Sequence, residues 1–222
     1  MSHPLGAAMT RAGKSLADNP HQFHETEPDA PRALIAVEGR RIAHCGGEIW
    51  ECAAGRGAMA IEFEAAGFRV VATDLVRRRP RLGLIAPILP GIDFLAEPEL
   101  RAPVIITNPP YDDAAEKFIR HALSLKPLYA AFLLKAHYFN ADCRRDLFRS
   151  HPPSRIWPLG FRLDWTGQGS PTMECAWFVW DLCAGPMRRH RPAESAAWGG
   201  HPASLYMPAL PRATPRPKGG AA

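Results

Sequence analysis

Apolar and polar positions along the middle of the chain follow two alternating spacings. Runs of apolar and β-branched residues predict strands at residues 48–51, 68–73, 91–95, 104–106, 129–134, 154–165 and 174–182. Apolar residues at helical spacing predict helices at residues 32–43, 58–66, 113–125 and 140–149. Because strands and helices take turns, we predict the α/β class, with a Rossmann-like, doubly wound, mostly parallel seven-stranded sheet flanked by helices.

The two ends of the chain lack this periodicity. Residues 1–20 mix small and charged residues and predict a flexible N-terminal arm, ahead of one domain at residues 21–182. Residues 183–222 are rich in proline and arginine and predict a disordered tail. The formal net charge is +5, and this tail holds six Arg or Lys against one Glu. The predicted domain is therefore close to neutral, so the net charge by itself does not indicate a basic binding face.

Cysteine spacing and hydropathy exclude several classes of protein. The five cysteines are odd in number and contain no C-x-x-C pair, which favours neither a zinc site nor a disulfide framework. We therefore expect no metal. No apolar run reaches the length of a membrane span, and the first residues do not resemble the core of a signal peptide. We expect a cytoplasmic protein that does not contact a membrane.

A turn of small residues separates the strand at residues 48–51 from the helix that follows. After Glu51 the turn contains the small residues Ala53, Ala54, Gly55 and Gly57. Glycines let the backbone approach a ligand closely, and the helix that begins here offers free N–H groups. The next strand ends in Asp74, whose carboxylate can accept hydrogen bonds from ribose hydroxyls. This βαβ arrangement is typical of dinucleotide-binding units. The alternative is that Asp74 is an ordinary solvent-exposed carboxylate at a strand end.

A second loop follows the apolar run at residues 104–106. Its residues are Asn108, Pro109, Pro110 and Tyr111. Proline cannot continue a strand, so the chain leaves the sheet here, at the edge where open α/β sheets bind ligands. The Asn108 side-chain oxygen and the Pro109 carbonyl can accept hydrogen bonds from one planar amine, and Tyr111 can stack on its ring. Taken alone, Asn-Pro-Pro is also an ordinary turn sequence.

Together, the two loops resemble motifs of the S-adenosylmethionine-dependent amino-methyltransferases, especially bacterial and phage DNA adenine methyltransferases. The segment Glu51 to Gly57 resembles their first motif, E-P-x-x-G-x-G, with Cys52 in place of the proline. Asn108 to Tyr111 resembles their catalytic tetrapeptide, and Asp93-Phe94 their adenine-contacting pair. A looser match precedes the first predicted helix, where Phe23 and Thr26 resemble an N-terminal cofactor motif. The resemblance covers roughly residues 21–182.

The resemblance implies S-adenosylmethionine as cofactor and a role for each motif. Glu51 or Asp74 would bind the ribose of the cofactor, with Leu75 next to Asp74. Residues 53–57 would line the methionine end of the cofactor. Asp93 and Phe94 would hold the adenine of the cofactor. Asn108 and Pro109 would hold the target amine, with Pro110 and Tyr111 completing the catalytic loop.

The implied partner is nucleic acid, with adenine in DNA favoured as the substrate. No separate target-recognition domain is visible in the sequence, so a protein glutamine side chain and an adenine in RNA remain alternatives. A third alternative is a non-catalytic nucleic-acid-binding module that keeps the fold. The target sequence and the oligomeric state stay open.

Overall fold

The computed structural model describes residues 25–110, 113–164, 171–183 and 208–212 of the chain. Its centre is a seven-stranded sheet in the order β3-β2-β1-β4-β5-β7-β6. The strands are β1 Glu48–Glu51, β2 Arg69–Asp74, β3 Ile88–Pro90, β4 Val104–Thr107, β5 Tyr129–Lys135, β6 Arg155–Pro158 and β7 Cys175–Asp181. Only β7 is antiparallel to its neighbours, β5 and β6. The predicted fold class, a mostly parallel doubly wound sheet, is therefore confirmed.

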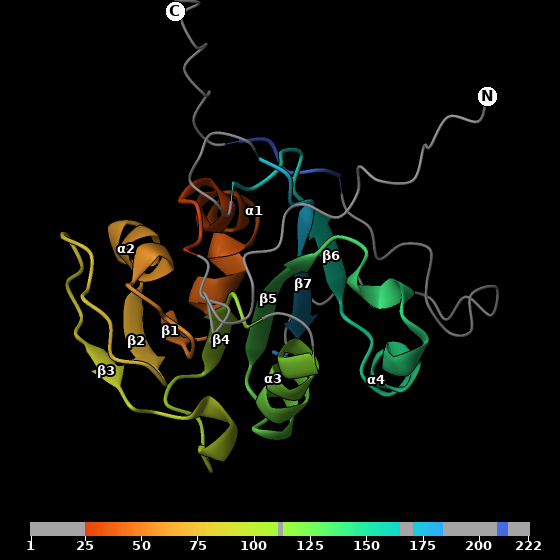
Figure 1. Cartoon of the computed structure of the whole chain (residues 1–222), viewed down its shortest axis with the longest axis horizontal. Helices are drawn as coiled ribbons and strands as arrows, with labels where there is room; N and C mark the ends of the chain where they lie inside the picture. The colour runs from red at the N-terminus through yellow and green to blue at the C-terminus, as the bar shows by residue number, and fades with distance from the viewer. Residues whose placement is uncertain (1–24, 111–112, 165–170, 184–207, 213–222) are drawn as a thin grey trace, which may run out of the picture.

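Helices cover both faces of this sheet (Figure 1). They are α1 Asp29–His44, α2 Ala58–Ala65, α3 Asp113–Ser124 and α4 Arg145–Ser150, and three short 3₁₀ turns are η1 Phe94–Ala96, η2 Tyr138–Asn140 and η3 Asp142–Arg144. Helices α1 and α2 lie on one face, and α3 and α4 on the other. This is the layered arrangement that right-handed connections between parallel strands produce.

Two hydrophobic cores, one on each face, hold the layers together. Ile49 and Ile106 point to the core beneath α1 and α2, whereas Trp50 and Ile105 point to the core beneath α3 and α4. Successive strand residues face opposite sides of a sheet, so a strand buried on both faces must be apolar throughout. This explains the uninterrupted apolar content of β4 and β5.

Three sequence predictions need correction. The strand predicted at residues 91–95 is β3 at Ile88–Pro90, followed by η1, because Gly91 has a φ of 77° and Asp93 caps the 3₁₀ turn. The edge position of β3 tolerates its proline. The helix predicted at residues 140–149 is broken into η2, η3 and α4, because Ala141 is extended. The strand predicted at residues 154–165 is only β6.

A short part of the predicted tail lies within the described residues. The structure describes residues 208–212, where Leu210 is 3% exposed and forms a parallel bridge with Leu159. The apolar side chain of Leu210 fills a place in the core beneath α1, which anchors this short segment. The remainder of residues 184–222, and residues 1–24, lie outside the described ranges.

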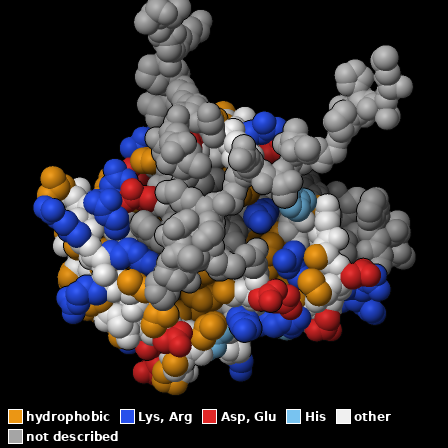
Figure 2. Space-filling model, in the orientation of Figure 1, with side chains coloured by type: hydrophobic (Ala, Val, Ile, Leu, Met, Phe, Trp, Pro, Cys, Tyr) orange, Lys and Arg blue, Asp and Glu red, His pale blue; other side chains and the backbone are white. Residues whose placement is uncertain are grey.

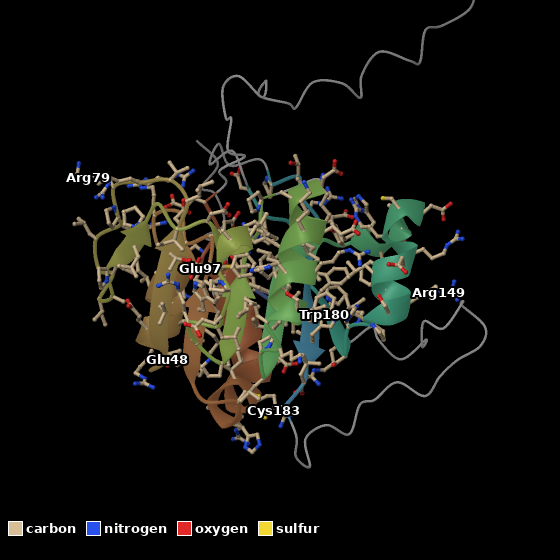
Figure 3. All side chains as sticks on the ribbon, turned by 90° about the horizontal axis from the view of Figure 1, so that it is seen from below. Glu48, Arg79, Glu97, Arg149, Trp180 and Cys183 are labelled. Carbon is tan, nitrogen blue, oxygen red and sulfur yellow. The ribbon has the colours of Figure 1, made fainter. Side chains whose placement is uncertain are left out.

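The sheet has two further edges, formed by the amino-terminal and the carboxyl-terminal ends of its parallel strands, and different residues lie at each. In Figure 3, Glu48, at the start of β1, and Cys183, after β7, lie at one edge, and Arg79 lies at the opposite edge. The loops that follow β1, β2 and β4 all leave at the edge where Arg79 lies, because these strands are parallel. The two motif loops of the sequence are thus brought to one side. None of the described helices combines the length and apolar character needed to cross a membrane.

Candidate functional site

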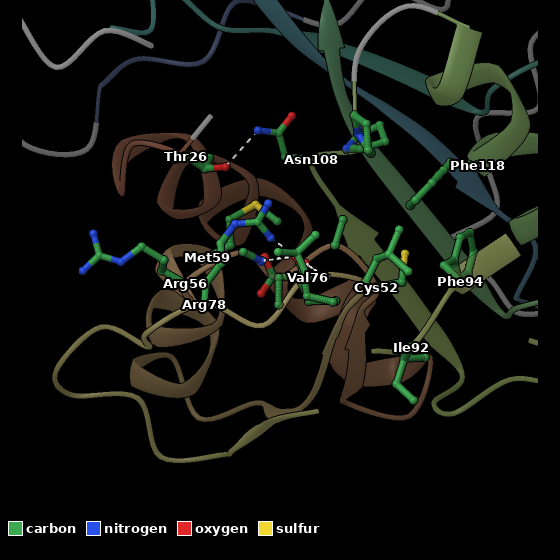
Figure 4. Close-up of a pocket in the computed structure, with 18 of the residues that line it drawn as sticks. Thr26, Cys52, Arg56, Met59, Val76, Arg78, Ile92, Phe94, Asn108 and Phe118 are labelled. Atoms are coloured by element: carbon green, nitrogen blue, oxygen red, sulfur yellow. Dashed lines mark hydrogen bonds and ion pairs between the residues drawn. The ribbon is translucent and has the colours of Figure 1, made fainter. Parts of the chain in front are cut away.

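A cavity of about 390 Å³ opens at the carboxyl ends of β1, β2 and β4 (Figure 4). The residues predicted from sequence that line it are Thr26, Glu51, Ala53, Ala54, Gly55, Asp74, Leu75, Asp93, Phe94, Asn108, Pro109 and Pro110. Both motif loops therefore open into the same space. A cavity of this volume is within the range that encloses a small-molecule ligand.

Three predicted site residues stand apart from this lining. Phe23 and Tyr111 lie outside the described residues, so their predicted roles stay predictions. Gly57 is not among the lining residues; it precedes α2 with a φ of 85°. A Cβ at Gly57 would lie 2.9 Å from a Leu84 methyl carbon, so glycine here serves the turn and its packing.

Asp74 is a buried hydrogen-bond acceptor at the end of β2. Its side chain accepts the Gly55 N–H at 2.7 Å, the Val76 N–H at 2.7 Å and an Arg78 guanidinium N–H at 2.6 Å. The residue is 6% exposed, which excludes the alternative of an ordinary solvent-exposed carboxylate. An ionised carboxylate can accept about four hydrogen bonds, so these three donors leave room for about one more.

Glu51 ends β1 and is the second buried carboxylate of the cavity, 2% exposed. The Ala60 N–H, in the first turn of α2, donates to it. The atom Oε2 has no hydrogen-bond partner among the described residues. Burial raises the pKa of Glu51 well above its ordinary value, and the charges of Asp74 and Glu64 raise it further. A buried acceptor without a donor is costly unless a ligand supplies one.

The Asn108 amide has a defined orientation. Asn108 follows β4, and its Nδ2 donates a hydrogen bond to the Thr26 hydroxyl at 3.0 Å (Figure 4). Thr26 is itself 7% exposed and lies just before α1. Because the nitrogen is committed to Thr26, the side-chain oxygen is the end of the amide that faces away from that segment. The role predicted for this oxygen, as the acceptor for a target amine, stays a prediction.

The far wall of the cavity is apolar. Phe94 is 1% exposed and packs with ring centroids 5.1 Å from Trp50 and 4.9 Å from Phe118. It is thus a core residue as well as a lining residue. Asp93 lines the cavity and also accepts the Leu95 N–H at 3.0 Å as the cap of η1. An apolar wall with one nearby carboxylate suits an aromatic ring that bears polar edge groups.

Several lining residues were missed by sequence reasoning. Ile92, Leu95 and Phe118 extend the apolar wall, and Met59 lines the cavity from α2. Ile92 and Leu95 could have been predicted, because they flank the Asp93-Phe94 pair in the sequence. Arg78 also lines the cavity; its side chain is 17% exposed and pairs with Asp74. Arg78 lies four residues after Asp74, but this spacing predicts an ion pair only when the conformation of the intervening loop is known.

The comparisons with known proteins concern the fold. No protein-family model matches the chain, and no curated protein matches it. A protein of Listeria monocytogenes assigned as a class I S-adenosylmethionine-dependent methyltransferase superimposes with a TM-score of 0.54 and 17% identity. The match covers 77% of this chain and 67% of that one.

A second structure, of a Pyrococcus horikoshii protein assigned as an RNA methyltransferase, gives a TM-score of 0.57 and 14% identity. That match covers 74% of this chain and 88% of the other. The chain therefore has the fold of class I S-adenosylmethionine-dependent methyltransferases.

Proposed function

We propose that this protein is an S-adenosylmethionine-dependent methyltransferase that transfers a methyl group to an exocyclic amine, with adenine in DNA as the favoured substrate. One observation carries the proposal: the glycine turn and the Asn108 loop open into a single cavity. A donor bound at the first loop would lie next to an amine held at the second. The fold supports the same class of reaction.

The cavity has donor and acceptor groups that fit this cofactor. The Oε2 of Glu51, which has no hydrogen-bond partner within the described part of the chain, can accept from the cofactor's ammonium or hydroxyl groups, and Asp74 has room for about one ribose hydroxyl. Phe94 and Asp93 lie where an adenine ring can pack and hydrogen-bond. When bound, the cofactor supplies an electrophilic methyl group on a sulfonium.

The Asn108 loop would act on the other reactant. The Asn108 side-chain oxygen and the Pro109 carbonyl accept hydrogen bonds from the target NH2, which localises the nitrogen lone pair and points it at the methyl group. The nitrogen would bond to the methyl carbon as the bond from that carbon to the sulfonium sulfur breaks, which would leave a neutral thioether, and the nitrogen would lose a proton to solvent. Catalysis then comes mainly from orientation and from polarisation of the amine. Thr26 supports this role, since it keeps the Asn108 nitrogen away from the substrate side.

Nucleic acid is favoured as the source of the amine by the surface beside the cavity. Arg56 and Arg78 line the cavity, and Arg77, Arg79 and Arg81 are exposed on the loop between β2 and β3. Figure 2 shows basic side chains gathered over the β2 and β3 side of the molecule. Arginines in such a position can contact phosphates. A duplex base cannot enter the cavity while stacked, so the substrate base must be extruded or single-stranded.

Methyl transfer from labelled cofactor to double-stranded DNA, single-stranded DNA, RNA and cell protein, measured in parallel, tests this function. We expect label in DNA, on the adenine amine. Asn108→Ala should keep cofactor affinity and lower the transfer rate by about 10²–10³, the cost of one preorganised hydrogen-bonding group at a reacting centre. Asn140→Ala, at an exposed asparagine of η2, is the matched control and should behave like the parent.

The outcomes separate the alternatives. Label in protein alone would favour a glutamine side chain, and label in RNA alone would favour an RNA adenine. Equal transfer by Asn108→Ala and the parent would show that the loop does not hold the amine. Absence of cofactor binding in calorimetry would favour the non-catalytic module.

A further inference from the structure

The short C-terminal segment at residues 208–212 is a fixed part of the domain surface. The Leu210 N–H donates to the Pro158 carbonyl at 2.8 Å, and the Gly160 N–H donates to the Leu210 carbonyl at 2.7 Å. Leu210 is buried against the core beneath α1. These bonds continue from the end of β6 and place the next residues of the segment beside the start of α1.

Arg212 uses that placement to bind two carboxylates. Its Nη1 lies 3.1 Å from a Glu27 oxygen and 2.5 Å from an Asp29 oxygen. Its guanidinium also lies over the Phe161 ring, 4.4 Å from the centroid. The side chain is 19% exposed, so these are partly desolvated, charge-assisted contacts. Such contacts hold their partners more firmly than solvent-exposed ion pairs do.

The two carboxylates belong to the 25–29 segment, which forms one wall of the candidate site. Glu25 and Thr26 line the cavity, and Thr26 accepts the Asn108 Nδ2. Glu27 also accepts the Asp164 N–H, so one side of the segment is tied to two distant parts of the chain. On its other side, Glu25 pairs with Arg81 at 3.4 Å and Arg56 at 4.0 Å.

The anchors on the two sides differ in strength. Arg56 and Arg81 have side chains that are 43% and 41% exposed, which makes their pairs with Glu25 weak and easily screened by salt. Arg212 is less exposed and contacts two acids at once. Its removal would therefore free the 25–29 segment more than removal of either other arginine.

We infer that Arg212 is a positioning residue: it holds the 25–29 segment so that Thr26 fixes the Asn108 amide and the cofactor wall. The catalytic part of this inference rests on the proposed function. Without Arg212, the segment would move more, Thr26 would bind the Asn108 nitrogen for less of the time, and the amide oxygen would be poorly oriented. The C-terminal segment would then be a working part of the site.

The test compares full-length Arg212→Ala, Arg212→Lys and a control, Arg69→Ala. Arg69 is an exposed arginine that pairs with Glu48 at 3.7 Å, at the opposite edge of the sheet. Hydrogen exchange is followed by mass spectrometry in peptides covering residues 25–34, and the affinity for S-adenosylmethionine by calorimetry. Values of kcat and KM for methyl transfer are measured on the substrate that accepts label.

Arg212→Ala should exchange faster in these peptides and bind the cofactor about tenfold more weakly, as expected if part of the free energy of its two charge-assisted hydrogen bonds serves to order the cofactor wall. We expect kcat to fall more than KM rises, because orientation of Asn108 matters most in the transition state. Arg212→Lys keeps the charge and should recover part of each effect. Arg69→Ala should match the parent in all measurements.

Unchanged exchange, affinity and kcat in Arg212→Ala would overturn the inference. A urea titration checks that this variant is folded; if it is not, the double variant Glu27→Gln, Asp29→Asn removes the same contacts from the other side. Exchange does not depend on the substrate. Faster exchange in a protein that methylates nothing would therefore support the role of Arg212 in holding the 25–29 segment and reject the proposed function. Normal exchange in a variant that still transfers methyl groups would reject the role of Arg212 and leave the proposed function standing.

Discussion

Two clusters of buried charge lie at opposite edges of the sheet, and they are built differently. Near the amino-terminal edge of the parallel strands, Arg155 binds Glu38 at 2.7 Å and Asp181 at 3.0 Å, and Arg41 binds Asp181 at 2.8 Å. The Trp157 indole N–H donates to Glu38 at 2.7 Å. Two guanidinium groups thus meet two carboxylates, and this cluster is balanced in charge.

The cluster in the cavity is not balanced in the number of acidic and basic groups, and burial favours the protonated, uncharged form of the extra acid, Glu51. Glu51 and Asp74 both have buried carboxyl groups. Arg78 pairs with Asp74. One oxygen of Glu51 has no donor within the part of the chain that the structure describes. In a balanced buried network the opposite charges offset one another and removal of one partner is costly, whereas an acid without a partner carries a cost that a cationic or hydrogen-bond-donating ligand can relieve. The balanced cluster also holds a buried atom without a hydrogen-bond partner among the described residues, Arg41 Nη1, so the two clusters differ in their balance of acidic and basic groups and in their position relative to the cavity.

Arg155→Ala is the strongest way to break this comparison. It would leave Glu38 and Asp181 buried with one arginine fewer, and breaking a buried pair from one side costs about 3–5 kcal/mol of unfolding free energy. Urea unfolding followed by circular dichroism measures the loss. The exposed Arg69→Ala variant should lose less than about 1 kcal/mol. A loss of similar size in both variants would mean that the network contributes no more than a surface pair.

Glu51→Gln tests the other cluster and should have the opposite profile. Gln keeps the shape and one acceptor oxygen but loses the charge, so the affinity for S-adenosylmethionine should fall by about 10- to 100-fold, as for a lost hydrogen bond to a charged group. The unfolding free energy without cofactor should not fall, because the charged form is disfavoured by burial. Calorimetry and urea unfolding give the two values. Unchanged affinity would remove Glu51 from the cofactor site.

The contrast also shows what sequence reasoning reached. Strand and helix patterning predicted the central elements, because a strand such as β4 is buried on both faces and therefore appears in the sequence as a short apolar run. The two motif loops were found because proline cannot continue a strand and because glycine is favoured where the chain turns tightly after a strand. Parallel strands then bring such loops to one edge, so the lining of the cavity followed from the order of the elements.

Contacts between distant residues were not accessible in this way. The balanced cluster joins Arg155 to Glu38 across 117 positions, and Arg212 reaches Glu27 across 185. Neither pair has a local pattern, and Arg212 lies in a segment whose composition predicts disorder. Strand β3 was misplaced because Pro90 argues against a strand except at a sheet edge, and the position of an edge depends on the whole topology.

The pH dependence of stability gives the finest test of the unbalanced cluster. Because burial raises the pKa of Glu51 above that of an unfolded chain, the folded protein holds this proton more tightly than the unfolded one. Its contribution to stability is complete below the unfolded pKa and is lost as pH rises through the folded pKa, at no more than about 1.4 kcal/mol per pH unit for one proton.

Other groups titrate as well, so the useful quantity is the difference in unfolding free energy between the parent and Glu51→Gln from pH 4 to pH 9. Relative to the variant, the parent should become less stable as pH rises. A saturating cofactor should reduce this loss in the parent, because its positive groups favour the ionised Glu51. If the difference in unfolding free energy between the parent and Glu51→Gln does not change with pH, Glu51 does not bind a proton more tightly in the folded protein. Glu51 would then have a structural role, like the residues of the balanced cluster.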